Sequence, residues 1–225
     1  MFIHGYLLMD EHKMSKSLGN VLDPFKAMDM YGTDALRYYL LREVAFGQDG
    51  SISPEGFENR YNTELANEYG NLASRSLAMI ARYRDGVVPE AQAPAELAAG
   101  FDGLTDSVKA CLDRADVSGA LEQVWQRVRA LNRFVQETEP WKLSKDDAQA
   151  ERLDSVLYAV AEGLRVVSVL LHPWVPESAE RLLTALGRED RSLDTAGFGQ
   201  VGGGARIGDL GQLFPKVESP AASAA

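Results

Sequence analysis

Residues 53–85 read SPEGFENRYNTELANEYGNLASRSLAMIARYRD, and this stretch decides the fold. Ser53 followed by Pro54 is a strong helix start, because the serine hydroxyl can cap the helix and proline lacks the N–H that would stay unsatisfied there. The apolar residues that follow are spaced three to five positions apart: Phe57, Tyr61, Leu65, Tyr69, Leu72, Leu77 and Ile80. This spacing predicts one long amphipathic helix that ends near Asp85 and Gly86.

Three later segments carry the same helical periodicity. We predict a helix that begins at Ser118 and is broken by Pro140, another over about 147–172, and a shorter one over roughly 176–186. Each has an apolar stripe that must be covered, because exposed apolar surface is unfavourable in water. Antiparallel helices joined by modest loops cover one another, so the pattern predicts a helical bundle.

Upstream of the long helix the signals are shorter. Residues 3–10, IHGYLLMD, are apolar and form the only convincing strand signal in the chain. Asp23 with the following proline starts a short helix, and Thr33 caps a second one. The segment 46–53, FGQDGSIS, is predicted to be a turn-rich link. The expected fold is therefore mainly α, a helical bundle preceded by a remnant strand.

The last part of the chain has a different composition. Seven glycines lie within 197–211, which predicts an irregular segment, and the apolar group LFPKVE at 213–218 is expected to pin it to the body. The expected organisation is a first part over 1–50, a helical domain over 51–190 and an irregular glycine-rich tail over 191–225.

Composition narrows the class of protein. Of the 225 residues, 45% are hydrophobic and 25% charged, as in ordinary globular proteins. We expect no membrane segment, because no apolar run approaches the roughly 18 residues of a span, and no signal peptide, so the expected location is the cytoplasm. Cys111 is the single cysteine, which excludes a disulfide framework and a cysteine cluster for zinc, and no metal site is expected. The net charge of −10 means that any nucleic acid would be held by a few placed residues.

Residues 12–20 read HKMSKSLGN and form a polar cluster after the predicted strand. Lys13 and Lys16 offer two ammonium groups three positions apart, and Ser15 and Ser17 add hydroxyls. Such a loop is a plausible clamp for a polyphosphate, since lysine is a point charge on a flexible stem. A solvated surface loop is the alternative that composition alone leaves open.

The string KMSKS within this cluster is the second signature of class I aminoacyl-tRNA synthetases, and the chain around it resembles the methionyl-tRNA synthetases. The resemblance runs from HGYL and KMSKSLGNVLDP, through YGTDALRYYLLRE, to EYGNLASRS, ETEPWKL and LFPKVE, and so covers nearly the whole chain. It implies that the strand and loop belong to the end of a Rossmann-type catalytic domain, and that the bundle is an anticodon-binding domain.

The resemblance also implies a role for the loop. In the family the KMSKS loop closes on ATP, which acts with Mg²⁺ in the complete enzyme, while methionine is activated. Lys16 would stabilise the charge developing on the departing pyrophosphate, with Lys13 assisting, and Met14, Ser15 and Ser17 complete the ATP-binding string. The chemistry agrees, because a flexible cation lowers the barrier where negative charge moves onto a leaving group.

Two polar residues on the long helix are candidates for reading bases. Asn71 and Arg75 are four positions apart, so they project from one helix face and offer an amide and a guanidinium to unstacked bases. An ordinary polar helix face is the alternative, but the two match the family positions that contact the CAU anticodon. Arg129 and Arg133 are a further pair that could face phosphate, with a solvated face equally open.

Trp141 directly follows Pro140, where a helix is expected to break. An exposed indole at such a corner is a stacking platform, and the resemblance implies that it stacks on the first anticodon base. The other two tryptophans are expected to pack inside the protein: Trp125 fits the apolar stripe of its helix, and Trp174 lies between Pro173 and a valine.

One family feature is not found in the sequence. The complete enzymes carry a first signature, His-x-Gly-His or a close variant, and none of His4, His12 and His172 begins such a string. We therefore expect that this chain alone does not form methionyl-adenylate. Two interpretations stay open: the carboxyl-terminal part of a methionine–tRNA ligase, or a truncated, non-catalytic module that binds the tRNA anticodon. Another class I synthetase is a weaker third.

The expected partners follow from the resemblance. They are the methionine tRNA, with ATP and methionine in the complete enzyme. No membrane partner is expected, and a monomer is the expected state.

Overall fold

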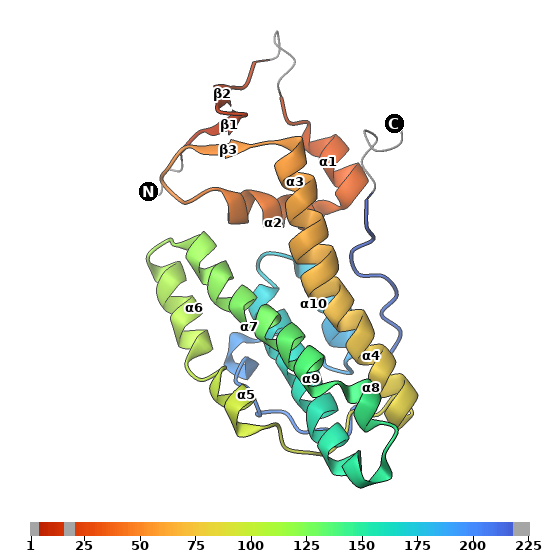
Figure 1. The fold of residues 1–225 in the computed structure, drawn as a ribbon. Helices are drawn as coiled ribbons and strands as arrows, with labels where there is room; N and C mark the ends of the chain where they lie inside the picture. The colour runs from red at the N-terminus through yellow and green to blue at the C-terminus, as the bar shows by residue number, and fades with distance from the viewer. Residues whose placement is uncertain (1–4, 16–20, 218–225) are drawn as a thin grey trace.

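The computed structural model describes residues 5–15 and 21–217, and Figure 1 shows a helical bundle with a small sheet at one end. The sheet has the strand order β2-β1-β3, with β1 antiparallel to β2 and parallel to β3. Leu8 of β1 pairs with Lys13 on one side and with Ser51 on the other. The predicted mainly helical fold is confirmed. The elements of this end are β1 (Leu7–Met9), β2 (His12–Lys13), α1 (Pro24–Tyr31), α2 (Thr33–Glu43) and β3 (Gly50–Ile52).

The sheet corrects one sequence prediction. The strand expected within 3–10 is confirmed at β1, but it has two partners, and β3 lies in the segment predicted to be a turn-rich link. Three residues are too few to show an alternating pattern, so the strand depends on its neighbour: the Gly50 N–H donates to the Tyr6 carbonyl at 2.9 Å, and the Asp10 N–H donates to the Ile52 carbonyl at 3.1 Å. Strand β3 therefore forms because it pairs with β1, which is distant in the sequence.

The long helix predicted over 53–85 is confirmed. It consists of α3 (Pro54–Arg60), η2 (Tyr61–Gly70) and α4 (Asn71–Arg84), and the Ser53 hydroxyl accepts a hydrogen bond from the Gly56 N–H at 2.9 Å, as a capping serine does. Asp85 ends it in the left-handed conformation. The middle part, η2, is π-helical, a rare geometry that often lies at functional sites.

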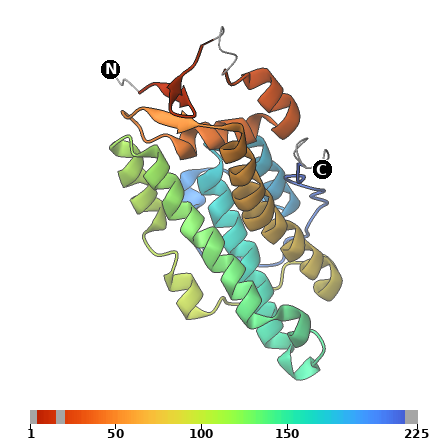
Figure 2. The same cartoon turned by 45° about the horizontal axis from the view of Figure 1, so that its top comes forward.

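Three other helices complete the bundle, and Figure 2 shows the two longest packed beside the long helix. They are α7 (Val117–Thr138), α9 (Ala150–Leu171) and α10 (Pro176–Ala185), close to the predicted bounds. The core between them includes Trp125 and Trp174, both almost fully buried as expected. Shorter elements connect them: α5 (Ala95–Ala99), α6 (Leu104–Asp113), α8 (Pro140–Leu143), η3 (Asp147–Gln149) and η4 (Leu193–Thr195). None of these short elements was predicted as a separate helix, although Leu104, Val108 and Cys111 give α6 a buried stripe.

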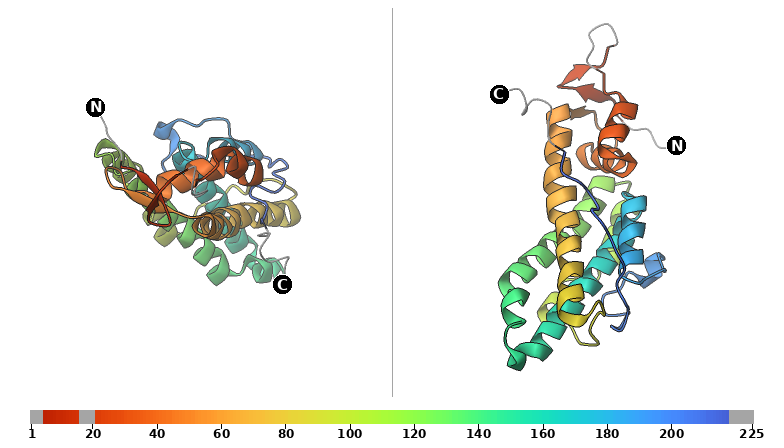
Figure 3. Two further views of the ribbon diagram at one scale, coloured as in Figure 1. Left: turned by 90° about the horizontal axis from the view of Figure 1, so that it is seen from above. Right: turned by 90° about the vertical axis from the view of Figure 1, so that its right-hand side faces the viewer.

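The irregular C-terminal segment is tied to the bundle. In Figure 3, right, it runs along the long helix, and the Tyr61 hydroxyl donates to the Pro215 carbonyl at 2.7 Å. Phe214 is buried and its ring lies near those of Tyr61 and Tyr69, at centroid distances of 6.1 and 6.3 Å. The apolar group around Phe214 therefore pins the segment to the body, as predicted.

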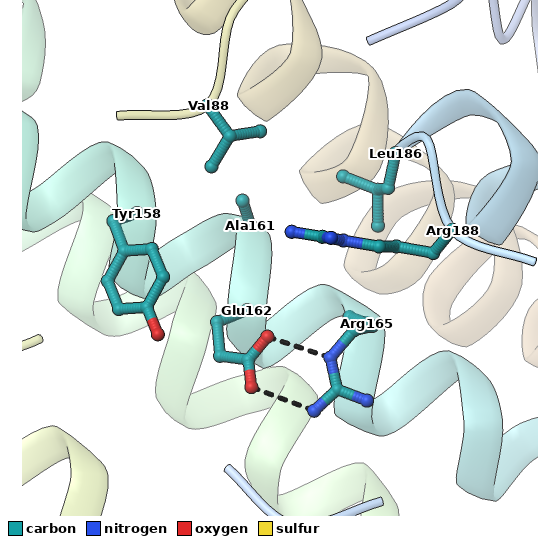
Figure 4. A pocket seen from close by; sticks show the side chains of 7 residues that line it. All are labelled: Val88, Tyr158, Ala161, Glu162, Arg165, Leu186 and Arg188. Atoms are coloured by element: carbon teal, nitrogen blue, oxygen red, sulfur yellow. Dashed lines mark hydrogen bonds and ion pairs between the residues drawn. The ribbon is translucent and has the colours of Figure 1, made fainter. Parts of the chain in front are cut away.

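A buried ion pair holds the first part of this segment, and Figure 4 shows it from close by. Glu162 and Arg165, one turn apart on α9, form two hydrogen bonds of 2.7 Å, and their side chains are 2% and 4% exposed. Arg165 also donates to the carbonyls of Thr195 and Gly197, and the Gly199 N–H donates to Glu162 at 2.8 Å. Backbone groups of the irregular segment thus satisfy the buried charges.

None of the helices within 5–15 and 21–217 combines the length and the apolar character that crossing a membrane requires. Over the same residues, no group of three or more His, Cys, Asp or Glu side chains is placed to hold a metal ion.

Candidate nucleic-acid interface

The lysine loop lies at the sheet end of the molecule. Lys13 is exposed at the end of β2, and Met14 is partly buried against the hydrophobic core. Lys16 and Ser17 lie outside the described residues, so the clamp of two ammonium groups stays a prediction.

Arg75 and Trp141, far apart in the sequence, line one hollow. It lies between α4, α7 and α8 and has a volume of about 270 Å³. Its walls are mostly apolar or aromatic, with two arginines among them. The lining residues are Arg75, Ala78, Met79, Arg82, Tyr83, Val135 and Trp141. The arrangement offers aromatic rings and guanidinium groups to one flat ligand.

Asn71 is exposed at the first position of α4, as is Arg75 one turn later. It lines a neighbouring hollow of about 140 Å³, to which Ser74 and the C-terminal Lys216 also contribute. Asn71 and Arg75 thus present polar groups to solvent from the same helix, but they line different hollows.

Trp141 is less exposed than the sequence analysis expected. It is half-buried and packs partly against the core, because α7 ends at Glu139 in the left-handed conformation and Pro140 begins the short helix α8. Pro140 is itself buried, and α8 packs on α9. The proline therefore starts a new turn, and the indole becomes a wall of the hollow.

Arg75 is held from α7. One of its terminal nitrogens, Nη2, donates to Asn132 Oδ1 at 3.3 Å. The Asn132 amide nitrogen donates to the carbonyls of Glu68, at 2.8 Å, and Val128, at 3.1 Å. A cation–π contact adds to the rim, with the Arg82 guanidinium 5.7 Å from the centroid of the Tyr83 ring.

The two arginines of the second predicted pair, Arg129 and Arg133, have different surroundings. Arg129 forms a close ion pair with Glu122, which also binds Arg42 of α2 at 2.5 Å, whereas Arg133 is exposed. The two-arginine patch facing phosphate therefore stays a prediction, in which Arg129 shares one carboxylate with Arg42.

A buried charge network joins the sheet end to the bundle. Glu64 of η2 is 5% exposed and accepts hydrogen bonds from Tyr38 at 2.5 Å, Arg42 at 3.2 Å and Arg60 at 3.0 Å. Burial alone would raise the pKa of Glu64, but hydrogen bonds from Tyr38 and Arg42 and the charges of the two arginines hold it below its ordinary value. Burial, together with the Glu64 charge, raises the pKa of Tyr38 well above its usual range.

Sequence reasoning missed Asn132 and Tyr83 as parts of the interface. Asn132 had a weak signal, since asparagine is a poor helix former and an asparagine inside a helix needs hydrogen-bond partners. Tyr83 had none, because the residues that close the hollow opposite α4, Val135 and Trp141, come from other helices.

Two family models match the chain. The model described as tRNA synthetases class I (M) matches residues 1–77, and the model described as anticodon binding domain of methionyl tRNA ligase matches residues 88–219.

Curated relatives agree with these models. The chain is 40% identical over 224 residues to the methionine–tRNA ligase of Caldanaerobacter subterraneus subsp. tengcongensis, covering 97% of this chain and 35% of the relative. It is 41% identical over 231 residues to that of Bacillus subtilis (strain 168), covering 97% of this chain and 34% of the relative. The chain thus spans about a third of the length of these relatives.

Solved structures of methionyl-tRNA synthetase from Mycobacterium tuberculosis are similar too. The complex with methionyl-adenylate has a TM-score of 0.88 at 39% identity, covering 94% of this chain and 43% of that one. The free form has a TM-score of 0.85 at 36% identity, covering 96% and 43%.

Proposed function

The chain belongs to the methionyl-tRNA synthetase family, and from this premise we propose that it reads the anticodon and carries the ATP-closing loop of a methionine–tRNA ligase. That activity joins methionine to its tRNA with ATP. Because the chain spans about a third of the length of its relatives, the whole activity and its substrates, tRNA(Met), ATP and methionine, are part of the proposal.

The hollow that joins Arg75 to Trp141 carries the proposal. A flipped-out base can stack on an aromatic ring, which contributes about 1–3 kcal/mol per base, and the apolar Met79 and Val135 line the same space. Proteins that read RNA sequence generally bind such unstacked loop bases. An anticodon loop presents them.

Arg75 supplies base selectivity in this proposal. A guanidinium offers only hydrogen-bond donors. Cytosine presents two adjacent acceptors, N3 and O2, on its pairing edge, whereas uracil presents an N3–H donor in place of one of them. Arg75 is thus expected to favour cytosine, the first base of CAU, and Asn71 on the same helix to contact the loop beside it.

We assign the ATP contacts to Lys13, Met14, Ser15, Lys16 and Ser17. A polyphosphate with its Mg²⁺ suits a lysine such as Lys13, which is exposed at the end of β2. The positive charge of Lys16 would stabilise the charge that develops on the leaving pyrophosphate.

We propose the same division of the chain that the sequence predicts. Residues 1–50 form the end of a catalytic domain, 51–190 the anticodon-binding domain, and 191–225 an irregular tail. The start of α3 at Pro54 and the bonds of the tail to α9 support these bounds. A monomer that works in the cytoplasm, where tRNA is charged, completes the proposal.

The second candidate is a non-catalytic anticodon-binding module. The observation that favours it is that the lining of the Arg75–Trp141 hollow comes wholly from the bundle. Methionine-dependent exchange of pyrophosphate into ATP, measured with the 225-residue chain, tests the second candidate. No exchange is expected from this chain alone, and exchange would contradict that expectation and exclude the non-catalytic module.

Binding of an anticodon hairpin tests the proposal. We expect the chain to bind a stem-loop with a CAU anticodon more tightly than one with UAU, as measured by fluorescence anisotropy at one fixed salt concentration. Trp141→Ala is expected to weaken CAU binding about 5-fold to 150-fold, from the loss of one stacked base.

The matched control is Lys145→Ala, an exposed residue shortly after α8 that does not line the hollow. Equal affinity of the wild-type chain for both hairpins would overturn the anticodon assignment.

A further inference from the structure

We propose that Asn132 of α7 is a specificity-determining positioning residue that holds Arg75 in the orientation that reads the first anticodon base. This inference rests on the proposed function and deepens it. Asn132 does not line the hollow, so it acts through Arg75.

The hydrogen bonds of Asn132 determine which way its amide faces. Its Nδ2 donates to the Glu68 and Val128 carbonyls at 2.8 and 3.1 Å. Both carbonyls are pure acceptors, so only the NH₂ end of the amide can face them. The oxygen end is thereby turned toward Arg75, whose Nη2 donates to it at 3.3 Å.

The anchor of this arrangement is rigid. Glu68 belongs to η2, which is part of the long helix that also carries Arg75, and Val128 belongs to α7, which carries Asn132. The Asn132 amide therefore bridges these two helices. The Glu68 side chain in turn accepts a hydrogen bond of 2.6 Å from Trp125, which is fully buried. Arg75 is therefore connected through one amide to the core of the bundle.

Holding Arg75 matters because its side chain is long and the residue is exposed. Free arginine side chains lose much rotamer freedom when they bind, and a preset guanidinium plane loses less. Within the described residues, the Arg75 side chain makes no other hydrogen bond than the one to Asn132. The Asn132 oxygen is a neutral acceptor, so it leaves the charge of the Arg75 guanidinium unpaired. A carboxylate at position 132 would neutralise that charge, and it could not donate hydrogen bonds to the Glu68 and Val128 carbonyls.

A double-mutant cycle tests the proposal. Asn132→Ala is expected to raise the Kd for the CAU hairpin about 3-fold to 10-fold, the value of one lost hydrogen bond, and to lower the UAU-to-CAU ratio of Kd by a similar factor. In the Arg75→Ala background, the same change is expected to have no further effect on either hairpin.

Two further variants distinguish a loss of positioning from a folding defect. Asn132→Ser retains a hydroxyl that can bond the Val128 carbonyl, as serines in helices do, but does not reach Arg75, so it should lose the same discrimination as the alanine variant. Gln136→Ala, an exposed change one turn later on α7, should behave as the wild type. Circular dichroism at the binding temperature checks that each variant is folded.

The outcomes separate the two proposals. If the wild-type chain does not distinguish the hairpins, the proposed function fails and this inference fails with it. If the wild type distinguishes them and the folded Asn132→Ser variant does so equally well, only the positioning role is overturned. An equal loss of affinity for both hairpins that persists in the Arg75→Ala background also overturns it, since this would show a merely structural role.

Discussion

Replacing Glu64 by glutamine removes the negative charge at the centre of the network that joins α2 to the long helix. Glu64 is 5% exposed and accepts hydrogen bonds from Tyr38, Arg42 and Arg60. Removing one partner of a buried ion pair generally costs about 3–5 kcal/mol. Here each arginine keeps a second carboxylate, Glu122 or Glu43, and the glutamine oxygen can still accept one bond.

We therefore expect the Glu64→Gln variant to lose about 2–3 kcal/mol of unfolding free energy at pH 7, somewhat below the general range. For a chain of this size, that corresponds to a fall in Tm of about 4–12 °C. Urea unfolding followed by circular dichroism and by tryptophan fluorescence measures the difference, with linear extrapolation to water.

The pH dependence gives a second test of the same change. The pKa of Glu64 in the folded chain lies below its ordinary value of 4.5, because the hydrogen bonds and arginine charges outweigh the effect of burial. When the pKa of a carboxyl group is lower in the folded than in the unfolded protein, the group stabilises the folded state. This stabilisation is complete at pH values above the unfolded pKa and is lost as the pH falls through the folded pKa. The difference between wild type and Glu64→Gln should thus be fully present at pH 7 and should shrink once the pH falls below about 4.5.

The matched control is Glu137→Gln, the same chemical change at an exposed position of α7. Its effect is expected to stay within about 0.5 kcal/mol, as for most surface substitutions. A loss below about 1 kcal/mol for Glu64→Gln at pH 7, or a loss that does not vary between pH 7 and pH 3, would refute the view that this network stabilises the junction.

Three other substitutions test the packing of the bundle by the same urea assay. Asp34→Ala should lower the unfolding free energy by about 1–3 kcal/mol, because the buried Asp34 carboxylate of α2 accepts a hydrogen bond from the Ser178 N–H at 2.7 Å and so caps α10. A loss near zero would contradict this capping role. Glu162→Ala should cost about 3–5 kcal/mol by leaving Arg165 buried without its partner, whereas the double variant Glu162→Leu with Arg165→Met should recover much of that loss. Gly163→Ala should cost about 1–3 kcal/mol by overpacking, since an added Cβ would lie 2.5 Å from a leucine methyl of α7; unchanged stability would show that this contact relaxes freely.

The two proposed sites lie toward opposite ends of the molecule: one is in the sheet, and the other is in the last part of the long helix. In Figure 1, β2 with Lys13 lies near the start of α3, whereas Arg75 lies in α4, which ends beside α8. A helix of this length spans on the order of 40 Å. The Glu64 network lies between them, at η2.

The helices of this protein were predictable because their determinants are local. A capping serine, a proline at the first helical position and an apolar residue every three or four positions act within one or two turns, so the bounds of the long helix and of α7, α9 and α10 follow closely from the sequence. The family resemblance follows from the sequence as well, since the KMSKS string and the NLASR and EPW segments are contiguous.

Tertiary structure alone decided the features that depend on residues distant in the chain. Strand β3 exists because β1 pairs with it, and Trp141 is half-buried because α8 packs on α9. Glu122 of α7 binds Arg42 of the distant α2, and Arg75 donates a hydrogen bond to an asparagine from another helix. The sequence by itself thus determined the long helices and the side chains that are proposed to read a base. Packing determined which of them share a hollow, because the free energy of a non-local contact depends on where the other helices place its partner.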